Sequence, residues 1–159
     1  MAKKIIVIYY SHSGNTEKAA RAISRISGGT LCEIKPEVAY PKEYNKVVEQ
    51  AKKEIKNNYR PALKTKIDDI STYDTIFVGS PNWWSTIAPP VATFLAYHDL
   101  AGKTVVPFYT HGGGGAGAIE RDITKLCPDS KVLPGLSVSG SNADDAKISA
   151  WLQKIGIVK

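Results

Sequence analysis

Apolar segments of strand length alternate along the chain with segments whose apolar residues recur every three or four positions. Residues 4–10, KIIVIYY, form a continuous apolar run typical of a strand buried on both faces. Residues 42–58 place Tyr44, Val47 and Ala51 on the apolar stripe of the longest helix. We expect strands at 4–10, 30–35, 74–80, 103–110 and 131–138, and helices at 16–27, 42–58, 88–97, 116–127 and 143–155.

Strands that alternate with helices predict an α/β protein, in which a doubly wound parallel sheet carries helices on both faces. Five such strands fit the order 2-1-3-4-5. Pro107 and Pro134 fall inside the fourth and fifth strands and argue against unbroken ladders there. Because the chain shows no repeat, low-complexity tract or linker, we expect one domain over residues 1–159. A ligand is expected beyond the carboxyl ends of the strands, at the switch point between strands one and three.

The composition is that of a soluble globular protein, with 43% hydrophobic and 23% charged residues among 159. No apolar stretch approaches the roughly 20 residues of a membrane span, so no membrane partner is expected. The start of the chain, MAKKIIVIYYS, is similar to a signal peptide, but its apolar run is short and no small-residue cleavage site follows. We interpret it as the first strand of a cytoplasmic protein.

The net charge of +6 raises the question of nucleic-acid binding. The lysines are spread through the predicted helices and mixed with Glu, which is typical of solvated helix faces, so we expect no nucleic-acid partner. Cys32 and Cys127 are far apart, without CxxC spacing, and are expected to be reduced thiols in or near the core. A redox pair or a metal site is the alternative. We expect no metal site.

The turn after the first strand, Ser11 to Thr16, consists largely of hydroxyl and amide residues and contains no Lys or Arg. Gly14 allows a sharp turn and a close ligand. The helix that follows presents unpaired N–H groups and the positive end of its dipole, which together favour an anion. Plain helix capping by Ser, Asn or Thr is the alternative. The sequence favours a tightly held monophosphate, because it contains no GxxxxGK motif of a triphosphate site.

Two further loops should meet this turn at the same edge of the sheet. Trp83 and Trp84 are adjacent after the third strand, so they cannot both point into a core, and indoles offer a stacking surface for a flat ring. The segment HGGGGAG at 111–117 offers mainly backbone amides, with Thr110 and His111 as candidate hydrogen-bonding groups. Trp151 lies in a helical stripe and is expected in the core.

Two motifs in the glycine-rich segment point elsewhere. Gly112, Gly114 and Gly117 spell GxGxxG, but the next strand ends without the acidic residue of a dinucleotide site. HGGG at 111–114 is similar to an esterase oxyanion loop, but the chain has no GxSxG nucleophile motif. We therefore expect neither a dinucleotide fold of that type nor a hydrolase.

A phosphate turn, an aromatic loop and a glycine-rich loop, in this order on this sheet, resemble the flavodoxin family over essentially the whole chain. SHSGNT at 11–16 looks like the family's phosphate loop. The resemblance implies bound FMN. Around its phosphate we expect Ser11, His12, Ser13, Gly14, Asn15 and Thr16. Beside its isoalloxazine ring we expect Pro81, Asn82, Trp83, Trp84, Ser85 and Thr86. Near its pyrimidine edge we expect Thr110, His111, Gly112, Gly113 and Gly114.

The role that the resemblance implies is electron transfer between redox enzymes, with a reductase and an acceptor as partner proteins. An FMN-dependent NAD(P)H or quinone oxidoreductase is the alternative, and an FMN-free sensor or scaffold is a third. We name no catalytic residue. Electron-carrying flavodoxins are typically acidic, so a chain of charge +6 is expected to favour acidic partner surfaces and to give the bound flavin a less negative potential for its second reduction step.

Overall fold

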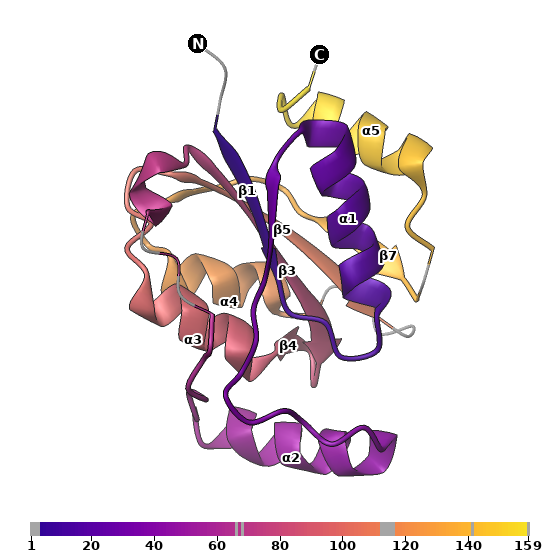
Figure 1. Cartoon of the computed structure of the whole chain (residues 1–159), viewed down its shortest axis with the longest axis vertical. Helices are drawn as coiled ribbons and strands as arrows, with labels where there is room; N and C mark the ends of the chain where they lie inside the picture. The colour runs from indigo at the N-terminus through magenta and orange to yellow at the C-terminus, as the bar shows by residue number, and fades with distance from the viewer. Residues whose placement is uncertain (1–3, 66, 68, 112–116, 141, 159) are drawn as a thin grey trace.

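The structure is a computed structural model that describes residues 4–65, 67, 69–111, 117–140 and 142–158. One β-sheet with its strands mostly parallel is surrounded by helices (Figure 1). The elements are β1 (Ile5–Tyr9), α1 (Asn15–Ser27), β2 (Thr30–Glu33), α2 (Tyr44–Lys56), the short 3-10 helix η1 (Ile70–Thr72), β3 (Thr75–Trp83), β4 (Thr86–Ile87), α3 (Pro89–Tyr97), β5 (Thr104–His111), α4 (Ile119–Leu126), β6 (Lys131–Val132), β7 (Leu136–Ser139) and α5 (Asp145–Lys154).

The sheet runs in the order β2-β1-β3-β5-β6, with β7 also paired to β5 and with β4 paired to β3. The predicted doubly wound α/β fold and the strand order 2-1-3-4-5 are confirmed. β1 lies between β2 and β3 and pairs with both in parallel, which explains its unbroken apolar sequence.

Two apolar layers pack on the sheet, one on each face. Val7, Phe77 and Phe108 point toward α1 and α5, where they meet Ile23 and Trp151. The predicted core position of Trp151 is confirmed, since only 8% of this residue is exposed. The neighbouring positions along the strands point to the other face, which α3 and α4 cover (Figure 1).

The predicted fifth strand is in fact two short strands, β6 and β7, separated at Pro134 and Gly135. The Leu133 N–H donates to the carbonyl of Val105, so that side of β5 faces β6 and β7. Pro107, two residues further along β5, faces the same side but has no N–H to offer. The outer strand is therefore interrupted where its neighbour lacks a donor.

α2 covers neither face of the sheet. Figure 1 shows it beyond the carboxyl ends of the strands, close to β4. Val47 and Ala51 are buried, but Tyr44, which the helical stripe placed inward, is 76% exposed. Leu63 and Ile67, from the segment after α2, pack against the core of the α3 and α4 face instead. The stripe was predicted correctly as a helix, but the packing of Tyr44 was predicted wrongly.

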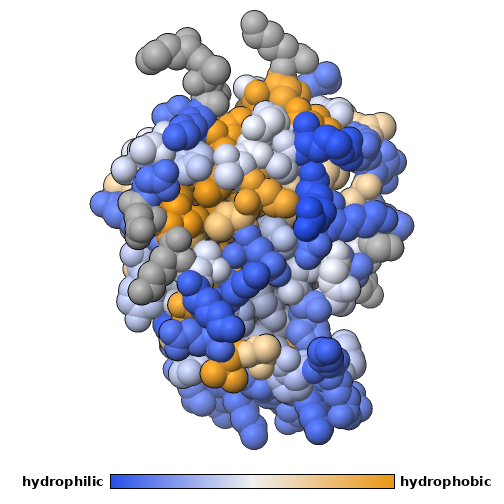
Figure 2. All heavy atoms as spheres, viewed as in Figure 1, coloured by the Kyte–Doolittle hydropathy of each residue, from blue (hydrophilic) through white to orange (hydrophobic). Residues whose placement is uncertain are grey.

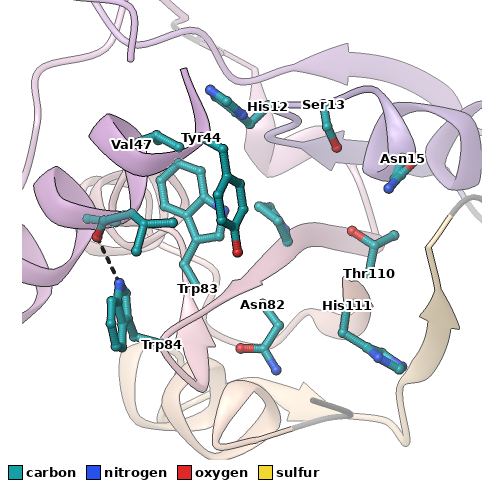
Figure 3. A pocket seen from close by; sticks show the side chains of 13 residues that line it. His12, Ser13, Asn15, Tyr44, Val47, Asn82, Trp83, Trp84, Thr110 and His111 are labelled. Atoms are coloured by element: carbon teal, nitrogen blue, oxygen red, sulfur yellow. Dashed lines mark hydrogen bonds between the residues drawn. The ribbon is translucent and has the colours of Figure 1, made fainter. Parts of the chain in front are cut away.

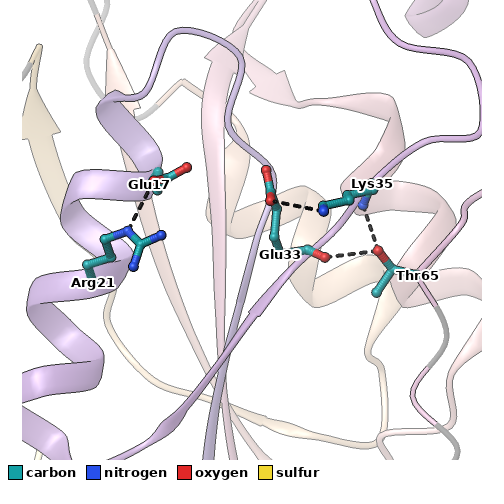
Figure 4. Close-up of polar contacts among 5 residues, drawn as sticks. All are labelled: Glu17, Arg21, Glu33, Lys35 and Thr65. Carbon is teal, nitrogen blue, oxygen red and sulfur yellow. Dashed lines mark hydrogen bonds and ion pairs between the residues drawn. The ribbon is translucent and has the colours of Figure 1, made fainter.

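The segment at residues 62–65 lies beside the chain that follows β2, where its backbone bonds to Lys35 and Glu37 (Figure 4). The hydroxyl of Thr65 donates to the carbonyl of Glu33 at 2.9 Å and accepts the N–H of Lys35 at 2.7 Å. Lys35 also lies within 3.9 Å of the Glu33 carboxylate. On the opposite side of β1, Arg21 pairs with Glu17 along α1. The side chain of Thr65 thus makes hydrogen bonds with backbone groups that face outward where β2 ends.

Among the described residues, no helix has both the length and the apolar character that a membrane span needs. Cys32 is half-buried and Cys127 is buried, and both are free thiols. Burial raises the pKa of the Cys127 thiol to about 11.

Candidate functional site

The turn between β1 and α1 is shaped by Gly14, whose backbone is left-handed, with φ of 99°. The Oγ atom of Ser11 accepts the Gly14 N–H at 3.1 Å and fixes the turn. The N-cap of α1 is Gly14, not Ser, Asn or Thr, and it makes no side-chain cap hydrogen bond. The capping alternative for the hydroxyl-rich turn is therefore wrong. The first N–H groups of α1 keep their capacity to bind an anion.

Thr16, in the first turn of α1, lies against the end of β5. Its hydroxyl is 2.7 Å from that of Thr110, and both residues are buried. One hydroxyl donates to the other, so the pair still has one hydrogen that a neighbouring acceptor can take. The contact joins the first turn to the third predicted segment across 94 positions of sequence.

The predicted aromatic loop is mostly strand. β3 continues through Pro81 and Asn82 to Trp83, because β5 continues beside it and pairs Thr110 with Pro81. The chain then reverses over Trp84 and Ser85 into β4, with Trp83 paired to Thr86. Trp84 and Ser85 have φ of 54° and 66°, which is the backbone of a two-residue hairpin turn. The expectation of a loop over residues 81–86 was wrong for Pro81, Asn82, Trp83 and Thr86, which lie in strands.

Trp83 stands in a cluster of aromatic rings. Its indole makes edge contacts with Tyr40 at 5.1 Å and with Tyr10 at 5.5 Å between ring centroids. His12 lies 5.9 Å away in the same manner, and its Nε2–H donates to the carbonyl of Pro41 at 2.8 Å. Burial raises the pKa of Tyr40, and a hydrogen bond to Glu54 raises it further. The cluster fixes the plane of Trp83.

Trp84 points away from Trp83 and toward α2. Its Nε1–H donates to the carbonyl of Val48 at 3.0 Å, and the ammonium of Lys52 lies 5.3 Å from the ring centroid. The residue is 49% exposed. The expectation that two adjacent tryptophans cannot both enter a core is confirmed. Trp84 therefore links the hairpin to α2 through this hydrogen bond.

A pocket of about 410 Å³ lies between these elements, at the carboxyl ends of β1, β3 and β5 (Figure 3). This volume is within the range of roughly 300–1,000 Å³ that small-molecule sites occupy. The turn before α1 contributes His12 and Ser13, and Asn15 is the first residue of α1. β3 and the hairpin contribute Pro81, Asn82, Trp83 and Trp84, β5 contributes Thr110 and His111, and α2 contributes Tyr44, Val47, Val48 and Ala51. None of these thirteen described residues is Asp or Glu.

A family model described as Flavodoxin matches residues 4–155. The chain belongs to the flavodoxin family. It is 28% identical to a flavoprotein from Lactobacillus acidophilus NCFM, solved in complex with FMN, with a TM-score of 0.79 and coverage of 94% of this chain and 99% of that one. A crystal structure of a protein from Bacteroides eggerthii DSM 20697 has a TM-score of 0.88 at 36% identity, with 99% of both chains covered.

The family also includes curated oxidoreductases among its relatives. The chain is 30% identical over 149 residues to an NAD(P)H dehydrogenase (quinone) from Rhodopseudomonas palustris (strain BisA53), which covers 84% of this chain and 71% of that protein. The sequence resemblance to flavodoxins is thus confirmed by the family match, and the oxidoreductase alternative has a relative of that name.

Nine of the residues that the flavodoxin resemblance assigned to the cofactor line this pocket. Ser11, Gly14 and Thr16 shape the turn beside it, and Ser85 and Thr86 lie on the far side of Trp84. Gly112, Gly113 and Gly114 fall outside the described residues. The nine are His12, Ser13, Asn15, Pro81, Asn82, Trp83, Trp84, Thr110 and His111.

Sequence reasoning missed the contribution of α2 to the pocket of this flavodoxin. Tyr44, Val47, Val48 and Ala51 recur at helical spacing, and the stripe was assigned to the core. The helical spacing of apolar residues indicates that one face of α2 is covered, but it does not indicate whether protein or a ligand covers that face. The exposed ring of Tyr44 beside a half-buried Val48 reflects a helix that borders a cavity.

Proposed function

We infer that the protein binds FMN in this pocket and carries electrons between redox enzymes. The observation that carries the proposal is the N-terminus of α1, which has no side-chain cap and opens beside Ser13 and Asn15 on a pocket bordered by Trp83. A phosphate there would meet helix N–H groups and neutral donors. The indole of Trp83 offers a wall for a flat ring. When bound, FMN supplies the redox chemistry, and the protein orients it and shields it.

The residue set fits a flavin monophosphate in size and in polarity. Ser13 and Asn15 lie at the α1 end and the apolar groups of α2 lie at the other, while Asn82 and His111 add polar groups along a further side (Figure 3). A phosphate at one end and a planar apolar ring at the other require this division. The solved FMN complex of the Lactobacillus acidophilus relative supports the same assignment.

The phosphate assignment is tested by comparing FMN with riboflavin. Ser13→Asp places a carboxylate beside the proposed phosphate and should weaken FMN binding by at least about tenfold, while riboflavin binding changes little. Ser71→Asp is the matched control, because Ser71 is exposed and precedes β3 at the opposite edge of the sheet. Flavin fluorescence and the visible absorption bands report both affinities. A protein that stays colourless in excess FMN contradicts the proposal.

We further propose partner proteins with acidic docking surfaces and a cytoplasmic location. Lys46, Lys52, Lys53 and Lys56 are exposed on α2, which borders the pocket. Figure 2 shows this end of the molecule covered mainly by hydrophilic residues. Positive charge beside the proposed flavin favours encounter with acidic surfaces. The proposed location is supported by the first apolar segment, which forms β1 in the middle of the sheet.

An FMN-dependent NAD(P)H or quinone oxidoreductase is a second candidate. The direction of Trp84 favours it, because two indoles do not enclose one flat ring when one of them is tied to Val48. The Rhodopseudomonas palustris relative is a quinone-linked NAD(P)H dehydrogenase by name. Steady-state oxidation of NAD(P)H with a quinone, compared with electron exchange with a flavodoxin reductase, separates the two candidates.

A further inference from the structure

A second groove of about 480 Å³ lies on the other side of Trp84, outside the proposed FMN pocket. The end of α2, the hairpin, the start of α3 and the outer side of α4 form its walls. Trp84 lines both cavities, so its ring separates the groove from the pocket. The volume is enough for a small-molecule ligand.

Three cationic side chains line this groove: Arg60, Arg121 and Lys125. Within the described part of the chain, Arg60 and Lys125 have no ion pair. Arg60 is half-buried and remains partly open to solvent at the groove, so an anion can reach it. Arg60 and Lys125 therefore present cationic groups that no carboxylate of the described chain pairs with.

The two carboxylates of the groove are already engaged by neighbours. Glu54 accepts hydrogen bonds from the hydroxyl of Tyr40 and the amide of Gln50. Asp122 accepts from the hydroxyl of Thr86 and pairs with Arg121 at 3.3 Å. The donors to Glu54 are neutral and leave its negative charge in place, so the three cations exceed the two carboxylates of the groove by one charge.

The remaining walls are aromatic and apolar. Tyr59 is 53% exposed and Trp84 is 49% exposed, so each has ring surface that another flat group can cover. Ile87 and Leu126 add apolar surface between them. Aromatic surface beside guanidinium and ammonium groups suits a ligand that joins a heteroaromatic base to phosphate.

We propose that this groove binds a nucleotide, with its phosphate at Arg60, Arg121 and Lys125 and its base against Tyr59 or Trp84. Because the groove and the pocket meet at Trp84, a nicotinamide dinucleotide held here by its adenosine phosphate can extend its other end toward the pocket. The site goes beyond the FMN proposal, since the groove does not depend on the α1 turn.

The test is a calorimetric titration of the FMN-loaded protein and of the FMN-free protein with NADP⁺, NAD⁺, AMP and inorganic pyrophosphate at low salt. Binding of NADP⁺ is expected in both forms, and Arg60→Ala and Lys125→Ala are each expected to weaken it by about tenfold. Backbone chemical shifts should move at residues 54–60, 84–87 and 118–126. FMN affinity should be unchanged in both variants, which distinguishes failure here from failure of the FMN proposal.

Lys131→Ala is the control, because Lys131 is an exposed cation at the start of β6, away from the groove. An equal loss of affinity in Lys131→Ala would mean general charge attraction and would overturn the site. Pyrophosphate that binds as tightly as NADP⁺ would overturn the nucleotide assignment, because the aromatic walls would then contribute nothing. Absence of binding for every probe at millimolar concentration also overturns it.

Discussion

The hydroxyl groups of Thr16 and Thr110 lie 2.7 Å apart in a buried contact that joins the first turn of α1 to the end of β5. Thr16→Val leaves the Thr110 hydroxyl buried without its partner and should lower the free energy of unfolding by about 1–3 kcal/mol. Thr16→Val combined with Thr110→Val removes both polar groups and should cost less than the two single losses added together. Urea unfolding of the four proteins measures the coupling, and strict additivity contradicts it.

The hydrogen bond from Trp84 to Val48 should control local opening of α2. Trp84→Phe keeps an aromatic ring but removes the indole donor, and amide hydrogen exchange in residues 44–56 should accelerate by about fivefold. Trp151→Phe is the control, because it removes a similar indole bond, to Pro134, in another part of the molecule. If both variants accelerate exchange in α2 equally, the effect is global and the prediction fails.

Substitution by Ala should lower the free energy of unfolding by different amounts at two glycines near the site. Gly14→Ala meets no atom within 4 Å, so its cost is the backbone penalty of about 1–2 kcal/mol for a left-handed residue. Gly117→Ala would place Cβ 2.6 Å from the carbonyl oxygen of Ser85, so the hairpin must shift as well. Gly117→Ala should therefore lower the free energy of unfolding more.

Thermal unfolding of these variants can be compared with that of Gly102→Ala, which has φ of 77° and open space. Gly102→Ala measures the backbone penalty alone and should match Gly14→Ala. Equal stability of the Gly14 and Gly117 variants would show that the contact at Ser85 relaxes without cost.

Stability should fall in alkali. Burial raises the pKa of Tyr9 to about 12, with the Glu33 carboxylate adding to the effect, and burial raises the pKa of Cys127 to about 11. The unfolded chain loses these protons near their ordinary values of 10.0 and 9.0, before the folded chain does. The free energy of unfolding should therefore hold up to about pH 9 and decrease as the pH rises toward 12.

Tyr9→Phe removes one of the responsible groups. Its free energy of unfolding should depend less steeply on pH above about pH 10 than that of the original protein, as measured by urea unfolding at a series of pH values. An identical slope in the two proteins would exclude Tyr9 as a contributor.

If FMN binds as proposed, its second reduction step should be easier than in acidic flavodoxins. The described lining of the pocket contains no carboxylate, and Lys52 lies beside it at Trp84. Positive charge stabilises the additional negative charge of a reduced flavin. Lys52→Glu should move the potential in the negative direction, whereas Lys131→Glu should change it less. A potentiometric titration of the loaded protein that finds equal shifts contradicts the argument.

The central strands and their helices were predictable because buried faces require apolar residues at regular spacings along the sequence. β1 was placed at 4–10 and occupies Ile5–Tyr9. β3 was ended too early, at residue 80, because Pro81 and Asn82 are common in turns; pairing with β5 extends it. The hairpin turn gave no signal, since Trp84 and Ser85 adopt positive φ without being Gly or Asn.

The sharp turn at Gly14 was also predictable, because Ser11 and Gly14 act through local geometry, whereas phosphate binding at this turn stays a prediction. The wall formed by α2 was not predictable, since the position of a helix that covers no face of the sheet depends on contacts distant in sequence. Val48 meets Trp84 across 36 positions. Tyr40 likewise meets Glu54 through a side-chain bond that no periodic pattern reports.

The two edges of the sheet determine whether strands of separate copies of this protein can pair. On one edge, Thr65 engages the carbonyl of Glu33, the last residue of β2, and the N–H of Lys35 just beyond it. On the other, the break at Pro134 leaves only the short strands β6 and β7. A long row of free backbone groups is what recruits a strand from another molecule, and in the described chain β2, β6 and β7 span only four, two and four residues. Growth of the sheet from copy to copy is therefore disfavoured, and the protein should stay dispersed when concentrated.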